Sequence, residues 1–216
     1  MPSAPTPRAV LFDFDGTLID SFPAIAASVN HVRSLRGLAP LSVPEVTRHV
    51  GRGAWYLLRH TVEGGELEAN VAAYREHHPS VLRDLTRLLP GAKEALEALK
   101  ARGVRLGLCS NKPVEFSRRL VQYLGVAELL DVVLGPEDVA RPKPAPDMLL
   151  EAMRRLGCRP DEVLYVGDMT VDIETARAAR ARVWVVATGT DSAEVLDAAR
   201  PDRRLAGLAD LAGLLG

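Results

Sequence analysis

The sequence has few cysteines, with only Cys109 and Cys158 among its 216 residues. These two do not form a disulfide framework and lack the spacing of a zinc site, so we expect a protein of the reducing cytoplasm. Long apolar segments are also missing, because no run approaches the roughly 18 residues that a membrane-spanning helix needs. The first eight residues are rich in proline and serine without the apolar segment of a secretory signal, which predicts a frayed tail.

An excess of charge of one sign is missing as well. The 27 basic and 28 acidic residues give a net charge of −1, which excludes a general electrostatic footprint for nucleic acid or an anionic membrane. The five histidines show no HExxH or other metal-binding spacing. Lysine is scarce among the basic residues, which makes each one a candidate for a specific role: Lys93, Lys100, Lys112 and Lys143.

What the sequence does have is 47% hydrophobic residues, arranged as short apolar runs that alternate with helical patterns. The apolar runs predict buried parallel strands at residues 8–15, 104–110, 131–135, 163–168 and 182–187. Helical periodicity is found at residues 92–102, 114–124 and 147–156, and each pattern stops at a glycine. The alternation predicts an α/β fold with a doubly wound, Rossmann-like parallel sheet.

One stretch breaks this alternation. Residues 20–88 carry no strand-like run and instead show helical periodicity at residues 21–35, 46–62 and 67–89, separated by glycine and proline. An insert of this length directly after the first strand is too long for a loop. We therefore expect two domains, an α/β core of residues 1–19 and 89–216 and a small all-helical cap domain of residues 20–88.

Chemically active residue types follow the predicted strands. Ligands of an open α/β sheet bind outside the carboxyl ends of its strands. Two acids on one side of a strand end repel each other unless a cation relieves them, and a set of carboxylate oxygens suits Mg²⁺. The residues at these ends are Asp13 and Asp15, then Ser110 and Asn111, then Lys143 in a loop, then Asp168 and Asp172.

Each of these residues also has an ordinary structural interpretation. Asp13 and Asp15 form a DxD pattern that occurs by chance in many chains, and the Ser110–Asn111 pair is suited to cap a helix. Lys143 stands between two prolines, as a solvated loop charge would, and the two later acids are suited to cap the helix that begins near residue 170. Four such features in fixed order at successive strand ends are much harder to explain by capping.

The sequence resembles the haloacid dehalogenase superfamily of Mg²⁺-dependent phosphatases over nearly its whole length. Residues 13–18, DFDGTL, match the first motif of that family, and Ser110–Asn111 matches the second. Lys143 within RPKPAPD matches the third motif, and Gly167–Asp168 through Asp172 matches the fourth. The four motifs at these separations make the resemblance highly specific.

The resemblance implies a role for each motif residue. Asp13 is the nucleophile that takes the phosphoryl group, and Asp15 protonates the leaving oxygen and later activates water. Phosphate binding is implied for Gly16, Thr17, Ser110, Asn111 and Lys143. The implied Mg²⁺ ligands are Asp13, the backbone carbonyl of Asp15, and Asp168, with Asp172 supporting that site. The physics agrees, because Mg²⁺ and Lys143 offset the repulsion between a carboxylate and a phosphate.

Details favour the phosphoglycolate phosphatase-like branch of the family. Asp15 argues against haloalkanoate dehalogenases, and an insert without lysine argues against phosphonoacetaldehyde hydrolases. Residues 50–54, VGRGA, are similar to the VGNGA segment of the caps in that branch, with Arg52 in place of asparagine. A planar guanidinium matches a carboxylate bidentately, so we expect Arg52 to bind the anionic end of a small phosphorylated acid, unless this segment is only a turn between helices.

We therefore expect a phosphomonoester hydrolase that acts on a small molecule, with phosphoglycolate as the substrate. The enzymatic alternatives are a phosphosugar mutase of the same family and a pyrophosphatase. A phospho-receiver module is the non-enzymatic alternative, but such modules have about half this length and no helical insert. We expect no nucleic-acid or membrane partner and a monomer or loose homodimer.

Two features depart from the family pattern. Arg180 stands where a glycine ordinarily ends the helix, so either Arg180 is left-handed or the helix ends differently. Thr188–Gly189–Thr190 replaces a YGYG-like stretch, which weakens the assignment of the substrate.

Overall fold

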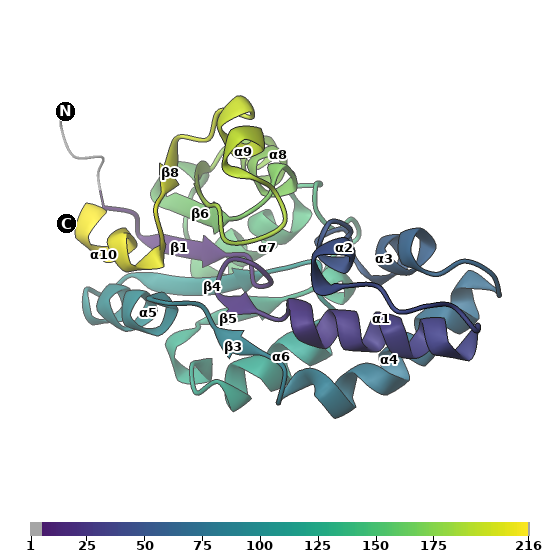
Figure 1. The fold of residues 1–216 in the computed structure, drawn as a ribbon. Coiled ribbons are helices and arrows are strands. Elements are labelled where there is room, and N and C mark those ends of the chain that lie inside the picture. The colour runs from purple at the N-terminus through teal and green to yellow at the C-terminus, as the bar shows by residue number, and fades with distance from the viewer. Residues whose placement is uncertain (1–5, 216) are drawn as a thin grey trace.

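The computed structural model describes residues 6–215, so residues 1–5 of the expected tail lie outside the described part of the chain. Its central sheet has six parallel strands in the order β5-β4-β1-β6-β7-β8 (Figure 1). The strands are β1 (Ala9–Phe12), β4 (Arg105–Cys109), β5 (Val132–Leu134), β6 (Val163–Gly167), β7 (Arg182–Val186) and β8 (Arg203–Leu205). The edge strand β8 was not predicted, because two of its three residues are exposed arginines.

Helices cover both faces of the sheet. Along β1, Val10 and Phe12 pack into one apolar cluster while Ala9 and Leu11 pack into the other, as the alternation of side chains along a strand requires. The first cluster includes α5 (Ala92–Ala101), α6 (Val114–Tyr123) and α10 (Leu211–Leu214), and the second includes α7 (Asp147–Leu156), α8 (Thr170–Ala178) and α9 (Ala193–Ala198). The predicted doubly wound α/β fold is confirmed.

The strand order places the switch point of the topology beside β1. Ala9 of β1 is in register with Arg105 of β4 on one side and with Val163 of β6 on the other. β4 and β6 therefore flank β1 on opposite sides, and the carboxyl ends of these three strands border one crevice. Short 3₁₀ helices complete the connections at Ala127–Leu129, Pro136–Asp138, Pro160–Glu162 and Leu208–Asp210.

Four further helices lie together beside the sheet and are here called the helical cap (Figure 1). They are α1 (Phe22–Leu35), α2 (Val43–Thr47), α3 (Ala54–Thr61) and α4 (Leu67–Leu82). They share an apolar cluster of their own, which includes Val29, Leu58 and Val71. The antiparallel strands β2 (Ile19–Asp20) and β3 (Arg87–Leu88) join this segment to the core. The division into two domains stays a prediction.

Two helical predictions in this segment were wrong in detail. The pattern at residues 46–62 forms two helices, α2 and α3. The segment between them is not helical, because Gly51 and Gly53 have φ angles of 104° and 84°, which a right-handed helix does not allow. The pattern at residues 67–89 ends at Leu82, and its last residues form β3 instead.

The helix that lacks its usual glycine ends in the first of the two expected ways. Arg180 follows α8 with a φ of 58°, in the left-handed region that glycine adopts without strain.

Among residues 6–215, no helix is long and apolar enough to cross a bilayer.

Candidate active site

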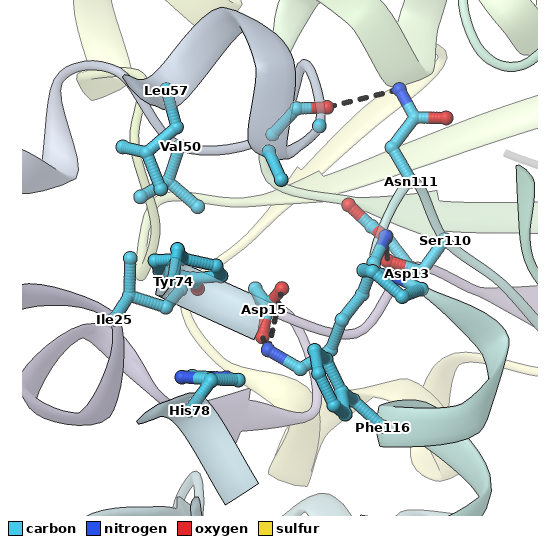
Figure 2. Close-up of a pocket in the computed structure, with 15 residues that line it drawn as sticks. Asp13, Asp15, Ile25, Val50, Leu57, Tyr74, His78, Ser110, Asn111 and Phe116 are labelled. Atoms are coloured by element: carbon cyan, nitrogen blue, oxygen red, sulfur yellow. Dashed lines mark hydrogen bonds and ion pairs between the residues drawn. The ribbon is translucent and has the colours of Figure 1, made fainter. Parts of the chain in front are cut away.

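A pocket lies between the carboxyl ends of the strands and the helical cap (Figure 2). The sheet side contributes polar groups, including Asp13, Asp15 and Ser110. The cap side contributes apolar side chains such as Ile25 and Leu57.

Asp13 stands at the junction of β1 with this pocket. The apolar run before it forms the buried strand, and Asp13 continues the ladder by donating its N–H to Val166 O over 2.9 Å. The side chain is only 5% exposed and its Oδ1 lies 3.0 Å from Lys143 Nζ. Oδ1 has no well-directed hydrogen bond among the described residues, so the ion pair leaves it able to accept another partner.

Lys143 is the buried cation beside Asp13. Its Nζ donates to Asp172 Oδ1 over 2.7 Å and to the Tyr165 hydroxyl over 2.9 Å. Burial alone lowers the pKa of a lysine, but the carboxylates of Asp13 and Asp172 outweigh it and raise the pKa of Lys143 above its ordinary value. Lys143 is therefore a permanent charge in the interior, and the interpretation as a solvated loop charge is wrong.

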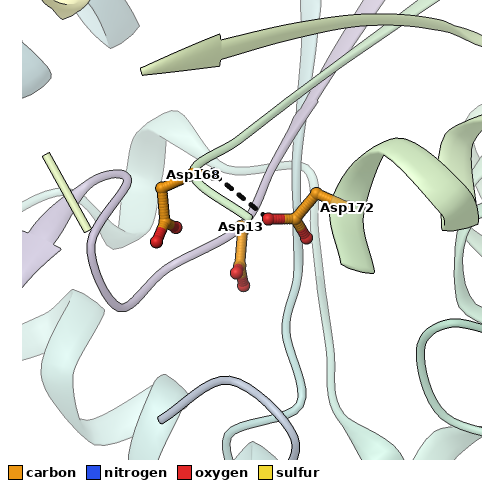
Figure 3. A group of neighbouring side chains, drawn as sticks. All are labelled: Asp13, Asp168 and Asp172. Carbon is orange, nitrogen blue, oxygen red and sulfur yellow. Dashed lines mark hydrogen bonds between the residues drawn. The ribbon is translucent and has the colours of Figure 1, made fainter. Parts of the chain in front are cut away.

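Three acids converge beside this lysine. Carboxylate oxygens of Asp13, Asp168 and Asp172 all lie within 4.8 Å of one another (Figure 3). Burial, with repulsion from Asp172, raises the pKa of Asp13 to about 6, although Lys143 opposes the shift. Burial and the neighbouring carboxylates also raise the pKa of Asp168 well above its usual range. Such crowding of like charge is what a bound cation relieves.

The three acids are held differently. Asp172 Oδ2 accepts the N–H groups of Asp168 and Met169 over 3.1 and 3.0 Å, so it caps α8 as well as contacting Lys143. Asp168 accepts from the Thr17 hydroxyl over 2.7 Å and from Thr190 N–H over 3.0 Å. The capping interpretation thus holds for Asp172, in addition to its place in the acid cluster.

Gly16 makes the turn that brings these groups together. Its φ is 83°, and a Cβ there would lie 2.6 Å from Asp168 Oδ2, so only glycine fits. The N–H groups of Gly16 and Thr17 donate to Ile19 O and Phe14 O within this turn. Neither residue is among those that line the pocket, and their expected contact with phosphate stays a prediction.

Asp15 lies at the boundary between core and cap. It accepts a hydrogen bond from Ser21 Oγ, and its Oδ1 and Oδ2 lie 2.9 and 3.3 Å from Lys112 Nζ. Both side chains are nearly buried, at 11% exposure for Asp15 and 3% for Lys112. Lys112 had no predicted role in the site.

Ser110 and Asn111 follow β4 into the pocket. Interaction with the Ser110 hydroxyl partly counteracts the rise in the pKa of Asp13. Asn111 Nδ2 donates to Lys143 O over 3.0 Å and to Gly51 O of the cap over 3.1 Å, and its Oδ1 accepts Lys143 N–H. Asn111 therefore ties the lysine loop and the cap to the sheet, and it is no helix cap, because Pro113 takes that position at α6.

The structure does not bring Arg52 to Asp13 and Asp15. Its side chain is exposed, with the guanidinium carbon 5.4 Å from the centre of the Tyr56 ring. It lines a neighbouring pocket that also includes Trp55 and Arg75. Binding of a substrate anion by Arg52 stays a prediction.

Several site residues escaped the sequence analysis. Tyr165 stands in an apolar strand and looks like a core residue until its hydroxyl meets Lys143. Thr188 donates to Gly16 O over 2.7 Å, and it belongs to the stretch that departs from the family pattern. His78 lines the pocket from α4, and nothing in its helical spacing distinguishes it from a packing residue.

Comparisons with known proteins agree on one family. The sequence profile of the haloacid dehalogenase-like hydrolases matches residues 10–186. The chain is 37% identical to a phosphoglycolate phosphatase of Cereibacter sphaeroides, over 86% of this chain and 88% of that protein. It is 32% identical to the phosphoglycolate phosphatase of Escherichia coli O157:H7, over 97% and 92% of the two chains. A crystal structure described as a predicted phosphoglycolate phosphatase, from Haemophilus somnus 129pt, superposes with a TM-score of 0.92 at 27% identity, covering 98% and 99% of the chains.

Proposed function

The chain belongs to the haloacid dehalogenase-like hydrolases and is a phosphatase, and from that premise we propose that its substrate is phosphoglycolate, hydrolysed through a phosphorylated Asp13. The observation that carries the proposal is the placement of Asp13. It is a buried carboxylate at the end of the central strand, 3.0 Å from a buried lysine, and it lines a small pocket under the cap. Curated relatives at 32–37% identity carry that substrate in their names.

The donor set fits Mg²⁺, which we propose as the cofactor. Asp13 and Asp168 supply buried carboxylate oxygens, and we add the backbone carbonyl of Asp15 as the third protein ligand. The oxygens of Asp172 are occupied by Lys143 and by two N–H groups, which suits the supporting role. When bound, Mg²⁺ supplies positive charge that offsets the negative charge of the transferred phosphoryl group.

The residues of the chain divide the reaction into two displacements. A carboxylate oxygen of Asp13 forms a bond to phosphorus while the bond from phosphorus to the leaving oxygen breaks, and a proton on Asp15 passes to that oxygen. Water then attacks the phosphorus, gives its proton to Asp15, and displaces Asp13 as free phosphate forms. Lys143 keeps Asp13 oriented, and Ser110 and Asn111 with Gly16 and Thr17 are the proposed phosphate-binding residues.

We also propose that the enzyme works in the cytoplasm as a monomer or loose homodimer, without nucleic-acid or membrane partners. The balanced charge and the two unpaired cysteines support this setting. A phosphosugar mutase or a pyrophosphatase would use the same nucleophile, and the experiment below separates them.

The test is a phosphate-release screen over a panel of phosphorylated metabolites with Mg²⁺, in which Asp13→Asn provides the blank. The amide has the same shape as the carboxylate but cannot attack phosphorus, so turnover should vanish while the fold remains. We expect phosphoglycolate to give the highest kcat/KM. Release mainly from pyrophosphate, or conversion of a hexose phosphate to its isomer, would identify the alternatives, and activity of Asp13→Asn within about tenfold of the wild type would refute the mechanism.

A further inference from the structure

The pocket carries a second buried lysine on the side where the leaving group of a substrate must lie. Lys112 follows β4, is 3% exposed at its side chain, and lines the pocket beside Asp15. Lys143 stands behind Asp13 and is not among the lining residues. A cation that faces the cavity is therefore present in addition to the one that serves the nucleophile.

Lys112 has unused capacity as a hydrogen-bond donor. An ammonium group has three N–H donors, and among residues 6–215 its Nζ meets only the two oxygens of Asp15. Those two contacts, at 2.9 and 3.3 Å, share one carboxylate. A buried charge is stabilised when all of its donors are satisfied, so this ammonium is poised for a further acceptor that enters the pocket.

Among the described residues that line the pocket, Lys112 is the only lysine or arginine. His78 packs against Tyr74 with ring centres 5.0 Å apart, and its Nε2 has no partner in the described chain. Burial, helped by Lys112, lowers the pKa of His78 to about 2, so this ring is neutral. Ile25 and Phe116 complete this side of the pocket with apolar surface. In such an environment a single ammonium attracts a single small anion strongly.

The resting contacts of Asp15 conflict with its proposed role. Both of its oxygens face Lys112, and Oδ1 also accepts from Ser21. An oxygen that accepts from an ammonium cannot also present a proton to a leaving group from the same position. Some acceptor must draw Lys112 away before Asp15 can act as the acid, and Ser21 then still holds the carboxylate in place.

We propose that Lys112 is the specificity-determining residue. It gives up its ion pair with Asp15 and binds the carboxylate of the leaving group. The inference rests on the proposed function, because it names the group that binds the glycolate half of the substrate. Entry of the substrate carboxylate replaces one ion pair of Lys112 with another and leaves Asp15 beside the leaving oxygen, able to carry a proton. A neutral leaving group cannot make this exchange.

The test compares two substrates of nearly equal size, phosphoglycolate and 2-hydroxyethyl phosphate, which lacks the carboxylate. In Lys112→Gln, the ratio of kcat/KM for phosphoglycolate to that for 2-hydroxyethyl phosphate should fall by about 10- to 100-fold from the wild-type ratio. Lys112→Met is measured as a second variant, with thermal unfolding to confirm that each protein is folded. Lys93→Gln, at an exposed lysine of α5, is the matched control and should keep the wild-type ratio.

Inhibition by free glycolate gives a second measurement on the same proteins. Glycolate should compete with 2-hydroxyethyl phosphate in the wild type, and its inhibition constant should rise by about 10-fold or more in the Lys112 variants. An equal loss of kcat/KM on both substrates would overturn the proposal, and so would a fall of the ratio in Arg52→Gln but not in Lys112→Gln. Absence of phosphate release from every substrate by the wild type would instead refute the proposed function.

Discussion

The sheet side of the pocket is polar and densely hydrogen-bonded, whereas the cap side is mostly apolar, with few polar groups. On the sheet side, Lys143 has three partners and Asp172 accepts from both Lys143 and the start of α8. On the cap side, Ile25 and Leu57 present apolar surface, and the Nε2 of His78 has no partner among the described residues.

This difference predicts that the sheet side performs the chemistry and that the cap side influences the choice of substrate. A densely hydrogen-bonded network fixes the reacting groups in one geometry, so removal of its central cation should disturb both turnover and fold. An apolar surface with few polar atoms fixes little, so it can be altered without affecting the reacting groups. Lys112 and Asp15 lie at the boundary of the two sides, where the proposed recognition and proton transfer would meet.

Replacement of Lys143 should have the largest effect. Lys143→Met leaves the buried carboxylates of Asp13 and Asp172 without their cation, which we expect to abolish turnover and lower the free energy of unfolding by about 3–5 kcal/mol. Denaturant unfolding measures the second effect. Lys93→Met, on the surface of α5, should change stability by less than about 0.5 kcal/mol. If the two variants were equally stable, the sheet side would not be the rigid side of the pocket.

Asp15 should show the next largest effect, and the effect should depend on the leaving group. Asp15→Asn cannot protonate the leaving oxygen, so we expect turnover of an alkyl phosphate to fall by about 10²- to 10⁴-fold. An activated aryl phosphate needs less protonation and should retain relatively more activity. The measurement is kcat/KM for both substrates in both proteins, and equal losses would argue against the acid role.

Mg²⁺ should stabilise the folded protein through the acids on the sheet side of the pocket. At about 100 times its Kd, Mg²⁺ should raise the free energy of unfolding by about 2.7 kcal/mol. Thermal unfolding with and without the ion measures this, and Asp168→Asn should remove most of the gain. Excess chelator should abolish phosphate release, and full activity in chelator would contradict the metal site.

The smallest effect concerns the cap side and its pH dependence. The pKa of His78 is lowered to about 2 in the folded protein, against 6.5 as its ordinary value, so between these values only the unfolded chain binds a proton there. The stability of the folded protein is therefore undiminished above pH 6.5 and falls as the pH drops below it, by about 1.4 kcal/mol per pH unit from this group.

His78→Gln should remove this contribution. Urea unfolding of both proteins at pH 7, 6 and 5 should show the wild type losing its advantage over the variant as the pH falls. His60→Gln, at an exposed histidine of α3, is the matched control. A constant difference in stability across this range would mean that His78 titrates normally.

Much of the core was predictable because its signals are local. Five strands of the sheet are apolar runs, and β8 escaped because Arg203 and Arg204 are exposed at the edge. The helical cap was predictable as a helical segment, but the boundaries of its helices were not. Glycines at residues 51 and 53 split one expected helix, and the last residues of another became a strand because they pair with Ile19 across the chain.

The sequence by itself determined which groups meet at the sheet. Asp13, Ser110 and Asp168 each follow a strand directly, and parallel strands bring their carboxyl ends to one edge whatever the packing elsewhere. Only the tertiary structure decided which side chains face the cavity from the other side. Arg52 lies on the surface over Tyr56, because the docking of the cap depends on side-chain contacts between distant segments, such as Asn111 with Gly51, which no local pattern encodes. Lys112 follows β4 and meets Asp15, which is 97 residues away, and no local pattern encodes that contact either.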